Sequence, residues 1–79
     1  MDMEDISLRR LAVGQKAEII EVKASGEMGR RIRDMGLVSG AVVEVKGRAP
    51  LKDPVALRIN DFTLMLRNNE ADFIRVRPL

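Results

Sequence analysis

Hydrophobic and polar residues alternate along most of the chain, in short runs that are separated by turn-forming residues. An alternation with period two places successive side chains on opposite faces of a strand, so that one face can be buried. Short strands with this pattern are predicted around residues 20–22, 43–45, 55–59, 62–66 and 74–76. We therefore expect a mainly β protein of about five strands.

Asn60 and Asp61 stand between the runs 55–59 and 62–66, at the spacing of a two-residue hairpin. Both residue types tolerate a positive φ better than most, so the two runs should pair directly. Phe62 follows the alternation of Leu64 and Leu66, which predicts a place in the core. Strands this short leave exposed edges unless the sheet curls, so a small, partly closed barrel is expected.

One segment breaks the period of two and predicts a short helix near 27–35. Met28, Ile32 and Met35 recur at i, i+4 and i+7, which forms one stripe on a helix. Gly36 stands where a left-handed C-cap residue belongs. So short a helix needs tertiary support, and we expect the stripe to dock on the barrel; a partner-binding stripe is the alternative.

The outer face of this helix is rich in charge. Glu27 with Arg31 and Arg30 with Asp34 are i, i+4 pairs that could neutralise each other locally. Arg33 has no such partner in the helix. Arg30 and Arg33 are therefore candidates for contact with a carboxylate or phosphate on a binding partner.

Turn-forming residues mark the remaining connections. Gly14 and Gly40 each follow a leucine by three residues and are predicted at tight turns. Pro50 and Pro54 can stiffen a crossing between two strands. Leu51 between them is expected to be exposed, which favours a partner contact for this loop over a purely structural role.

The chain has 79 residues, no Cys and no His, so the sequence predicts one domain at residues 7–79 behind an acidic tail at residues 1–6. Residues from 8 onward carry 14 basic and 9 acidic groups, a net charge of +5. Such a surface suits an acidic protein, an anionic membrane surface or nucleic acid, or is simply a solvated surface. No apolar run approaches a membrane span and no secretory signal is recognisable, which predicts a cytoplasmic location.

The residue types also limit the chemistry. Without His or Cys, the usual catalytic and transition-metal sites are missing, so we expect neither an enzyme nor a bound cofactor or metal. A nucleic-acid-binding barrel is the main alternative. It is weakened by the absence of Trp and Tyr, since single-strand binders stack bases on aromatic side chains and only Phe62 and Phe73 are present.

Four motifs occur in an order and spacing that resemble the FeoA family, ferrous iron transport protein A, over about residues 7–77. They are Leu11-x-x-Gly14, Arg31-Ile32-x-x-Met35-Gly36-Leu37-x-x-Gly40, the run Ala-Pro-Leu-Lys-Asp-Pro-Val at 49–55, and Leu64-x-Leu66-Arg67-x-x-Glu70-Ala71. Ser39, Lys52 and Asn60-Asp61 depart from residues that are common in the family.

The resemblance implies an SH3-like small β-barrel in the bacterial cytoplasm, similar to the C-terminal domain of DtxR-type repressors. It also implies an adaptor that works with FeoB, a membrane protein with a GTPase domain and a ferrous-iron pathway. A link to transition metal ion binding comes from the resemblance alone. Pro50, Leu51 and Lys52 then join Arg30 and Arg33 as expected partner contacts, and a homo-oligomer is a further alternative.

Overall fold

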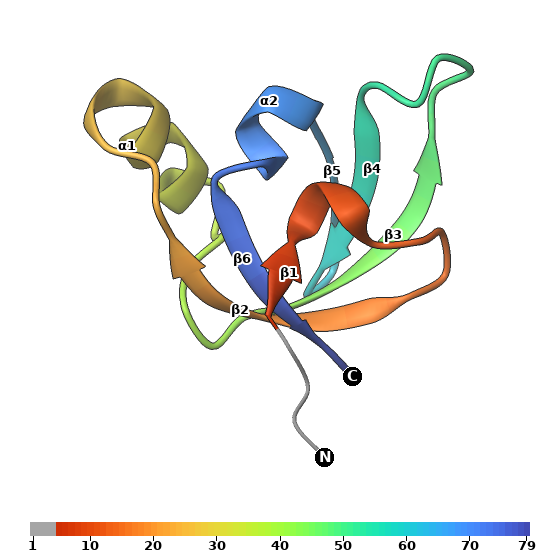
Figure 1. Cartoon of the computed structure of the whole chain (residues 1–79), viewed down its shortest axis with the longest axis horizontal. Coiled ribbons are helices and arrows are strands. Elements are labelled where there is room, and N and C mark those ends of the chain that lie inside the picture. Colours follow the sequence, from red (N-terminus) through yellow and green to blue (C-terminus); the bar gives the residue numbers. More distant parts are fainter. Residues whose placement is uncertain (1–4) are drawn as a thin grey trace.

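The computed structural model describes residues 5–79 and shows a curled antiparallel sheet with helices on one side (Figure 1). Its elements are β1 (Ile6–Ser7), the 3-10 helix η1 (Leu8–Arg10), β2 (Lys16–Val22), α1 (Gly26–Asp34), β3 (Val42–Arg48), β4 (Val55–Ile59), β5 (Phe62–Leu66), α2 (Asn68–Ala71) and β6 (Ile74–Pro78). All five predicted strands and the predicted helix are present. The short elements β1, η1 and α2 were not predicted.

The sheet has the strand order β1-β6-β2-β3-β4-β5, so β1 and β5 are its edges. Register shifts between Ile19 and Glu21 and between Val45 and Gly47 interrupt the two longest strands. Such irregularities bend a strand and increase its twist, which allows a short sheet to curl around one core. Residues 55–59 and 62–66 pair as predicted, with Ile59 opposite Phe62 across the Asn60-Asp61 turn.

Aliphatic side chains from β2, β3, β4, β5 and β6 fill the core, at the positions that the alternation predicts for β3, β4 and β6. In β2 the buried side chains are those of Ala17 and Ile19, whereas Ile20 and Val22 of the predicted run 20–22 are only half-buried. Ile32 of α1 is completely buried, and Met28 and Met35 of the same stripe pack half-buried against the core. Leu8 and Leu11, on either side of the η1 turn, are also buried. The helical segments thus supply core residues at the open side of the sheet.

The placement of Phe62 in the core was wrong. Leu66 is buried and Leu64 is half-buried, but the Phe62 side chain is 69% exposed. The three residues do share one face of β5, as the alternation requires. Phe62 lies at the hairpin end of this edge strand, where the face extends beyond the core.

Glycine is required at two different kinds of position. Gly36 ends α1 with φ +91°, the left-handed conformation expected at a C-cap, and Gly14 and Gly40 have similar φ values at their turns. Gly29 has an ordinary φ but no space: a Cβ atom there would lie 2.4 Å from the carbonyl oxygen of Ala24. This close approach lets the first turn of α1 pack against the segment that leads into it.

The N-terminal residues 1–4, which make up most of the predicted acidic tail, lie outside the described residues. Asp5 is described, and its Oδ1 lies 3.3 Å from Nε of Arg77. Ile6 pairs with Val76 as part of β1. Within residues 5–79, no helix is both long enough and apolar enough to cross a membrane.

Candidate partner-binding surface

The loop at residues 49–54 connects β3 to β4 and carries the most exposed large hydrophobic side chain of the described chain. Leu51 is 90% exposed. The loop is closed by two backbone hydrogen bonds, from Ala49 N–H to the Pro54 carbonyl at 3.1 Å and from Lys52 N–H to the Ala49 carbonyl at 2.6 Å. Leu51 therefore stands on a compact turn rather than on an extended segment.

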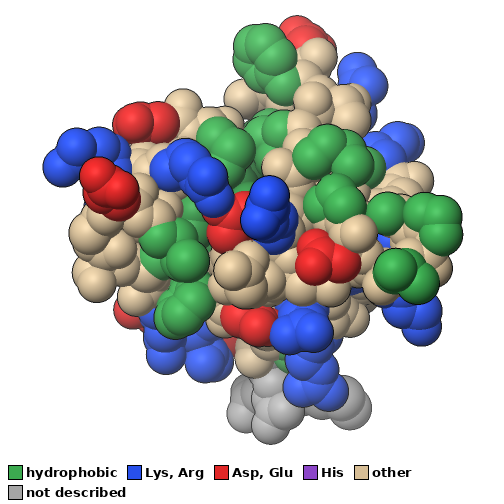
Figure 2. Space-filling model, turned by 90° about the horizontal axis from the view of Figure 1, so that it is seen from above, with side chains coloured by type: hydrophobic (Ala, Val, Ile, Leu, Met, Phe, Trp, Pro, Cys, Tyr) green, Lys and Arg blue, Asp and Glu red, His purple; other side chains and the backbone are tan. Residues whose placement is uncertain are grey.

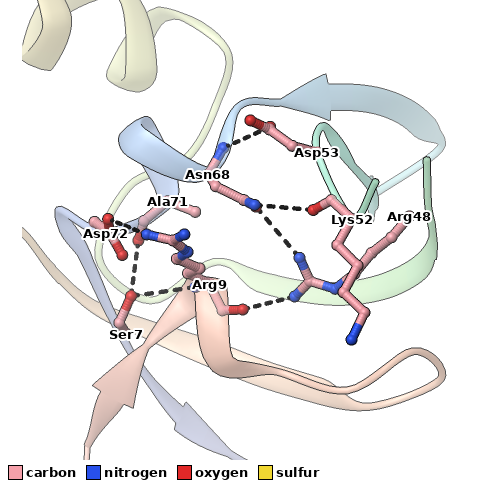
Figure 3. Close-up of polar contacts among 8 residues, drawn as sticks. All are labelled: Ser7, Arg9, Arg48, Lys52, Asp53, Asn68, Ala71 and Asp72. Carbon is pink, nitrogen blue, oxygen red and sulfur yellow. Dashed lines mark hydrogen bonds and ion pairs between the residues drawn. The ribbon is translucent and has the colours of Figure 1, made fainter. Parts of the chain in front are cut away.

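Two hydrogen bonds join the loop to α2, each between a side chain of one segment and the backbone of the other (Figure 3). Oδ1 of Asp53 accepts a hydrogen bond from the backbone N–H of Asn68 at 3.0 Å, which satisfies a free donor in the first turn of α2. Nδ2 of Asn68 donates to the Lys52 carbonyl at 2.9 Å. These two contacts fix the loop to a helix that is distant in the sequence.

Arg48, the last residue of β3, connects this loop to the η1 turn (Figure 3). Its Nη2 donates to the carbonyls of Arg9 and Leu11, at 2.7 and 2.8 Å, and its Nη1 donates to Oδ1 of Asn68 at 3.3 Å. Backbone carbonyls are the main partners of this guanidinium. The half-buried cation therefore has a structural role.

Together these segments surround a hollow of about 450 Å³, which we call the basic hollow. It is lined by Arg9, Arg10, Leu11, Arg48, Leu51, Lys52 and Asn68. Four of the lining residues are cations and none is acidic. Two carboxylates bind lining residues from outside: Asp72 pairs with Arg9 at 2.8 Å, and Asp53 accepts from the backbone N–H of Asn68. Such a site favours an acidic segment that can also place an apolar side chain against Leu51.

The charges of α1 are arranged differently from the prediction. Arg31 forms an ion pair with Glu70 of α2 instead of Glu27, and the recorded ion pairs of residues 5–79 include none between Arg30 and Asp34. Glu70 is 4% exposed, and its Oε1 accepts the backbone N–H of Arg67 at 3.1 Å. A buried acid whose partner lies on another helix holds α1 and α2 together.

A second, smaller groove of about 250 Å³ separates α1 from the loop and β5. Arg31, Met35, Pro54, Met65, Arg67 and Glu70 line this groove. Seen from above, this side of the molecule shows hydrophobic side chains interspersed with charged ones (Figure 2). Pro54, predicted as a structural turn residue, therefore also contributes to an exposed surface.

The structure thus brings together some of the predicted contact residues and separates others. Leu51 and Lys52 line the basic hollow, next to an exposed Pro50. Arg30 and Arg33 are exposed on α1, and Figure 1 shows α1 and the loop on opposite sides of α2. From the sequence, Arg9, Arg10 and Arg48 contribute only to the net positive charge. Nothing in the local pattern of residues indicates that they lie beside residues 49–54.

Within the described part of the chain, no group of three or more acidic side chains is arranged to hold a metal ion. The polar contacts described above all join groups of the protein itself: they involve backbone carbonyls, a helix terminus, the Asn68 side chain and two ion pairs.

Comparison with protein families decides the relationship. The FeoA domain model matches residues 6–78. The chain belongs to the FeoA family. FeoA domains are small and non-catalytic. The predicted family membership and the prediction that the chain is not an enzyme are therefore both confirmed.

Solved structures show the same fold. A FeoA-like protein from Clostridium acetobutylicum has 35% identity and a TM-score of 0.90, with 100% of this chain and 91% of that chain covered. FeoA of Stenotrophomonas maltophilia, described as an SH3 domain protein and solved with zinc, has 25% identity and a TM-score of 0.79 over 90% of this chain and 88% of that chain. The predicted SH3-like, mainly β fold is confirmed.

A manganese-dependent transcriptional repressor shares the fold at 19% identity, with a TM-score of 0.87; all of this chain matches 44% of the repressor. This agrees with the predicted likeness to a domain of DtxR-type repressors, and at this identity it shows the fold alone. Among curated proteins, a fusion of Fe(2+) transport protein A with the Fe(2+) transporter FeoB, from Porphyromonas gingivalis, is 41% identical over 69 residues. The match covers 87% of this chain and 8% of that protein.

Proposed function

We propose that this FeoA-family chain is an adaptor in ferrous iron transport that binds the cytoplasmic part of a FeoB-type transporter. The observation that carries the proposal is the Porphyromonas gingivalis fusion protein, whose name joins a relative of this domain to FeoB in one polypeptide. Two proteins that are covalently joined in one organism are good candidates for a complex where they are separate. The non-catalytic character of the family also favours an adaptor role.

The basic hollow and the loop tip are the surface that we assign to this complex. Leu51 offers an apolar anchor that is fixed in position by the contacts of residues 49–54. Lys52, Arg10 and Arg48 surround it with positive charge. An anchor at the centre of a charged rim is a common arrangement in interfaces, where the rim influences association rate and specificity.

The test measures binding of the full chain to the cytoplasmic GTPase domain of FeoB from the same organism by isothermal titration calorimetry. Leu51→Asp should weaken binding at least tenfold, because it removes the anchor. Leu79→Asp, at a site that is 68% exposed, is the matched control and should bind as the parent does. Equal binding by Leu51→Asp and the parent would reject the loop as the contact surface.

Charge is tested separately with a pair of reversals. Lys52→Glu in the basic hollow should lower the affinity for the GTPase domain. Salt screens the attraction between opposite charges, and the variant has lost one such attraction, so its affinity should depend less on salt than that of the parent. Arg58→Glu, at an exposed position on β4, should have little effect. A salt-resistant complex with single-stranded RNA or DNA, without any transporter binding, would replace the proposal with the nucleic-acid alternative.

An adaptor differs from an iron carrier in its own affinity for iron. The absence of His and Cys predicts that the isolated chain binds Fe²⁺ weakly. Anaerobic calorimetric titration at neutral pH should show no saturable binding at micromolar iron. Tight stoichiometric binding would contradict the adaptor proposal in favour of a carrier.

A further inference from the structure

The β5 edge of the sheet is a free strand, apart from the basic hollow and from the surface proposed for the transporter. β5 pairs with β4 along one side, and no other strand of the described chain pairs with its outer side. The other sheet edge, β1, is only two residues long. Within residues 5–79, β5 is therefore the one strand that presents a sheet edge of useful length.

The register of the hairpin shows which backbone groups point outward. Ile59 and Phe62 flank a two-residue turn, so they form a hydrogen-bonded pair, and Leu57 with Leu64 is the next such pair. The residues between them, Thr63 and Met65, must direct their N–H and C=O groups away from β4. Neither residue is recorded in any hydrogen bond to the turns and loops of residues 5–79.

The outer side of β5 is also accessible. Thr63 is exposed, and Met65 is 56% exposed at the edge of the groove beside α1, so the helix leaves it uncovered. Phe62, at the hairpin end, adds a further exposed aromatic side chain. The edge thus combines free backbone donors and acceptors with apolar side chains.

β5 lacks the protection that sheet edges usually have. Charged residues, prolines or bulges normally prevent an edge strand from pairing with a strand of another molecule. The sequence Phe-Thr-Leu-Met-Leu contains no charge and no proline, and its pairing with β4 is regular. Every other strand longer than two residues contains at least one charged residue.

We propose that β5 pairs antiparallel with β5 of a second copy of this chain, around a two-fold axis at Leu64. In this register Thr63 faces Met65 of the second copy, and Met65 faces its Thr63. Both outward-pointing residues then form hydrogen-bonded pairs, which gives four hydrogen bonds across the interface. Among the two-fold-symmetric registers, the one centred on Leu64 pairs the free groups of Thr63 with those of Met65, so β5 is complementary to itself. This favours a second copy over an unrelated strand.

The absence of charge also fits this occupant. Residues near a two-fold axis meet their own copies, so any charge on β5 would be repelled by itself. A neutral strand avoids this repulsion. The interface is short, so dimerisation should be weak, with a dissociation constant on the order of 0.1 mM, as for other interfaces of small area.

Sedimentation velocity and NMR amide exchange of the full chain test the pairing across a concentration series. The expected result is a monomer–dimer equilibrium in which the Thr63 and Met65 amides gain protection as concentration rises. A chain that stays monomeric to about 1 mM, or that gains protection at other residues instead, would overturn the proposal.

Two double variants sharpen the test. Thr63→Lys/Met65→Lys and Thr63→Glu/Met65→Glu each place four like charges on one face of the dimer, so each alone should raise the dissociation constant at least tenfold. A 1:1 mixture places Lys opposite Glu at both positions and should dimerise at least as well as the parent. Val42→Lys, on the inner strand β3, is the control and should dimerise normally.

Failure of the mixture to associate, while both variants remain folded by circular dichroism, would reject the β5 register. The result is independent of the transporter proposal, because neither Leu51 nor Lys52 belongs to this edge. Leu51→Asp should dimerise normally and fail to bind the transporter, whereas the two β5 variants should show the reverse.

Discussion

The loop 49–54 and helix α1 both lie on the side of the sheet that carries α2, but they are held there in different ways (Figure 1). The loop is fixed through backbone groups and through Asp53, so the side chains of Leu51 and Lys52 are left free. The helix is fixed through its own side chains, with Ile32 buried and Arg31 paired to Glu70. Residues without a structural task can serve a partner, which favours the loop.

Ile32→Asp should have the largest effect, because it tests the apolar attachment of α1. The substitution places an unpaired carboxylate at a completely buried position, which we expect to cost about 4 kcal/mol or more of unfolding free energy. Urea unfolding followed by circular dichroism measures the change. Met28→Asp, on the same stripe but half-buried, should be milder. An Ile32→Asp protein as stable as the parent would show that the stripe faces outward.

Glu70→Ala tests the polar attachment of the same helix. It removes the acceptor for Arg67 N–H and the partner of Arg31, for an expected loss of about 2–3 kcal/mol. A double-mutant cycle with Arg31→Met, followed by thermal unfolding, isolates the coupling of the pair. Arg30→Met should show no coupling to Glu70→Ala. Strict additivity of the Arg31 and Glu70 changes would mean that the ion pair does not hold α1 and α2 together.

Gly29→Ala tests the close approach at the start of α1. In an exposed helix, alanine is more stabilising than glycine by about 1 kcal/mol. At position 29, however, a Cβ atom would lie 2.4 Å from the Ala24 carbonyl oxygen and would force a backbone shift. We expect a net loss of about 1–2 kcal/mol. Gly47→Ala is the control, because a Cβ there meets nothing within 4 Å. Stabilisation by Gly29→Ala would show that the approach relaxes easily.

Asn68→Ala tests how the loop is fixed, and a smaller effect on stability is expected. It removes the side-chain contacts to the Lys52 carbonyl and to Arg48, which should cost about 1 kcal/mol. Amide exchange in residues 49–54 should increase while exchange in the strands is unchanged. Asn69→Ala, at the neighbouring exposed position, is the control. An equally protected loop in Asn68→Ala would place the support in the backbone turn alone.

The sequence predicted the strands well, since alternation in β3, β4 and β6 reflects burial on one face. It located β2 only in part, because the predicted run 20–22 is half-buried or exposed and the core residues of this strand are Ala17 and Ile19. It failed at Phe62, because the same alternation continues where an edge strand runs past the core. The Arg31 partner was missed for a related reason. Spacing along a helix identifies neighbours within it, whereas Glu70 approaches from another element. Contacts between residues that are distant in the sequence also form the basic hollow.

Arg33→Glu should have the smallest effect on stability and therefore separates the two surfaces most cleanly. Arg33 is exposed and is absent from the recorded ion pairs of residues 5–79, so reversal should change unfolding free energy by less than about 0.5 kcal/mol. We expect a few-fold loss of transporter binding and of iron uptake, weaker than for Lys52→Glu. Calorimetry on both variants and the parent, at one salt concentration, measures the difference. Unchanged binding and uptake in Arg33→Glu would exclude this residue and restrict the contact to the loop and basic hollow. A loss larger than for Lys52→Glu would instead make α1 the main contact and reverse the ranking of the two regions.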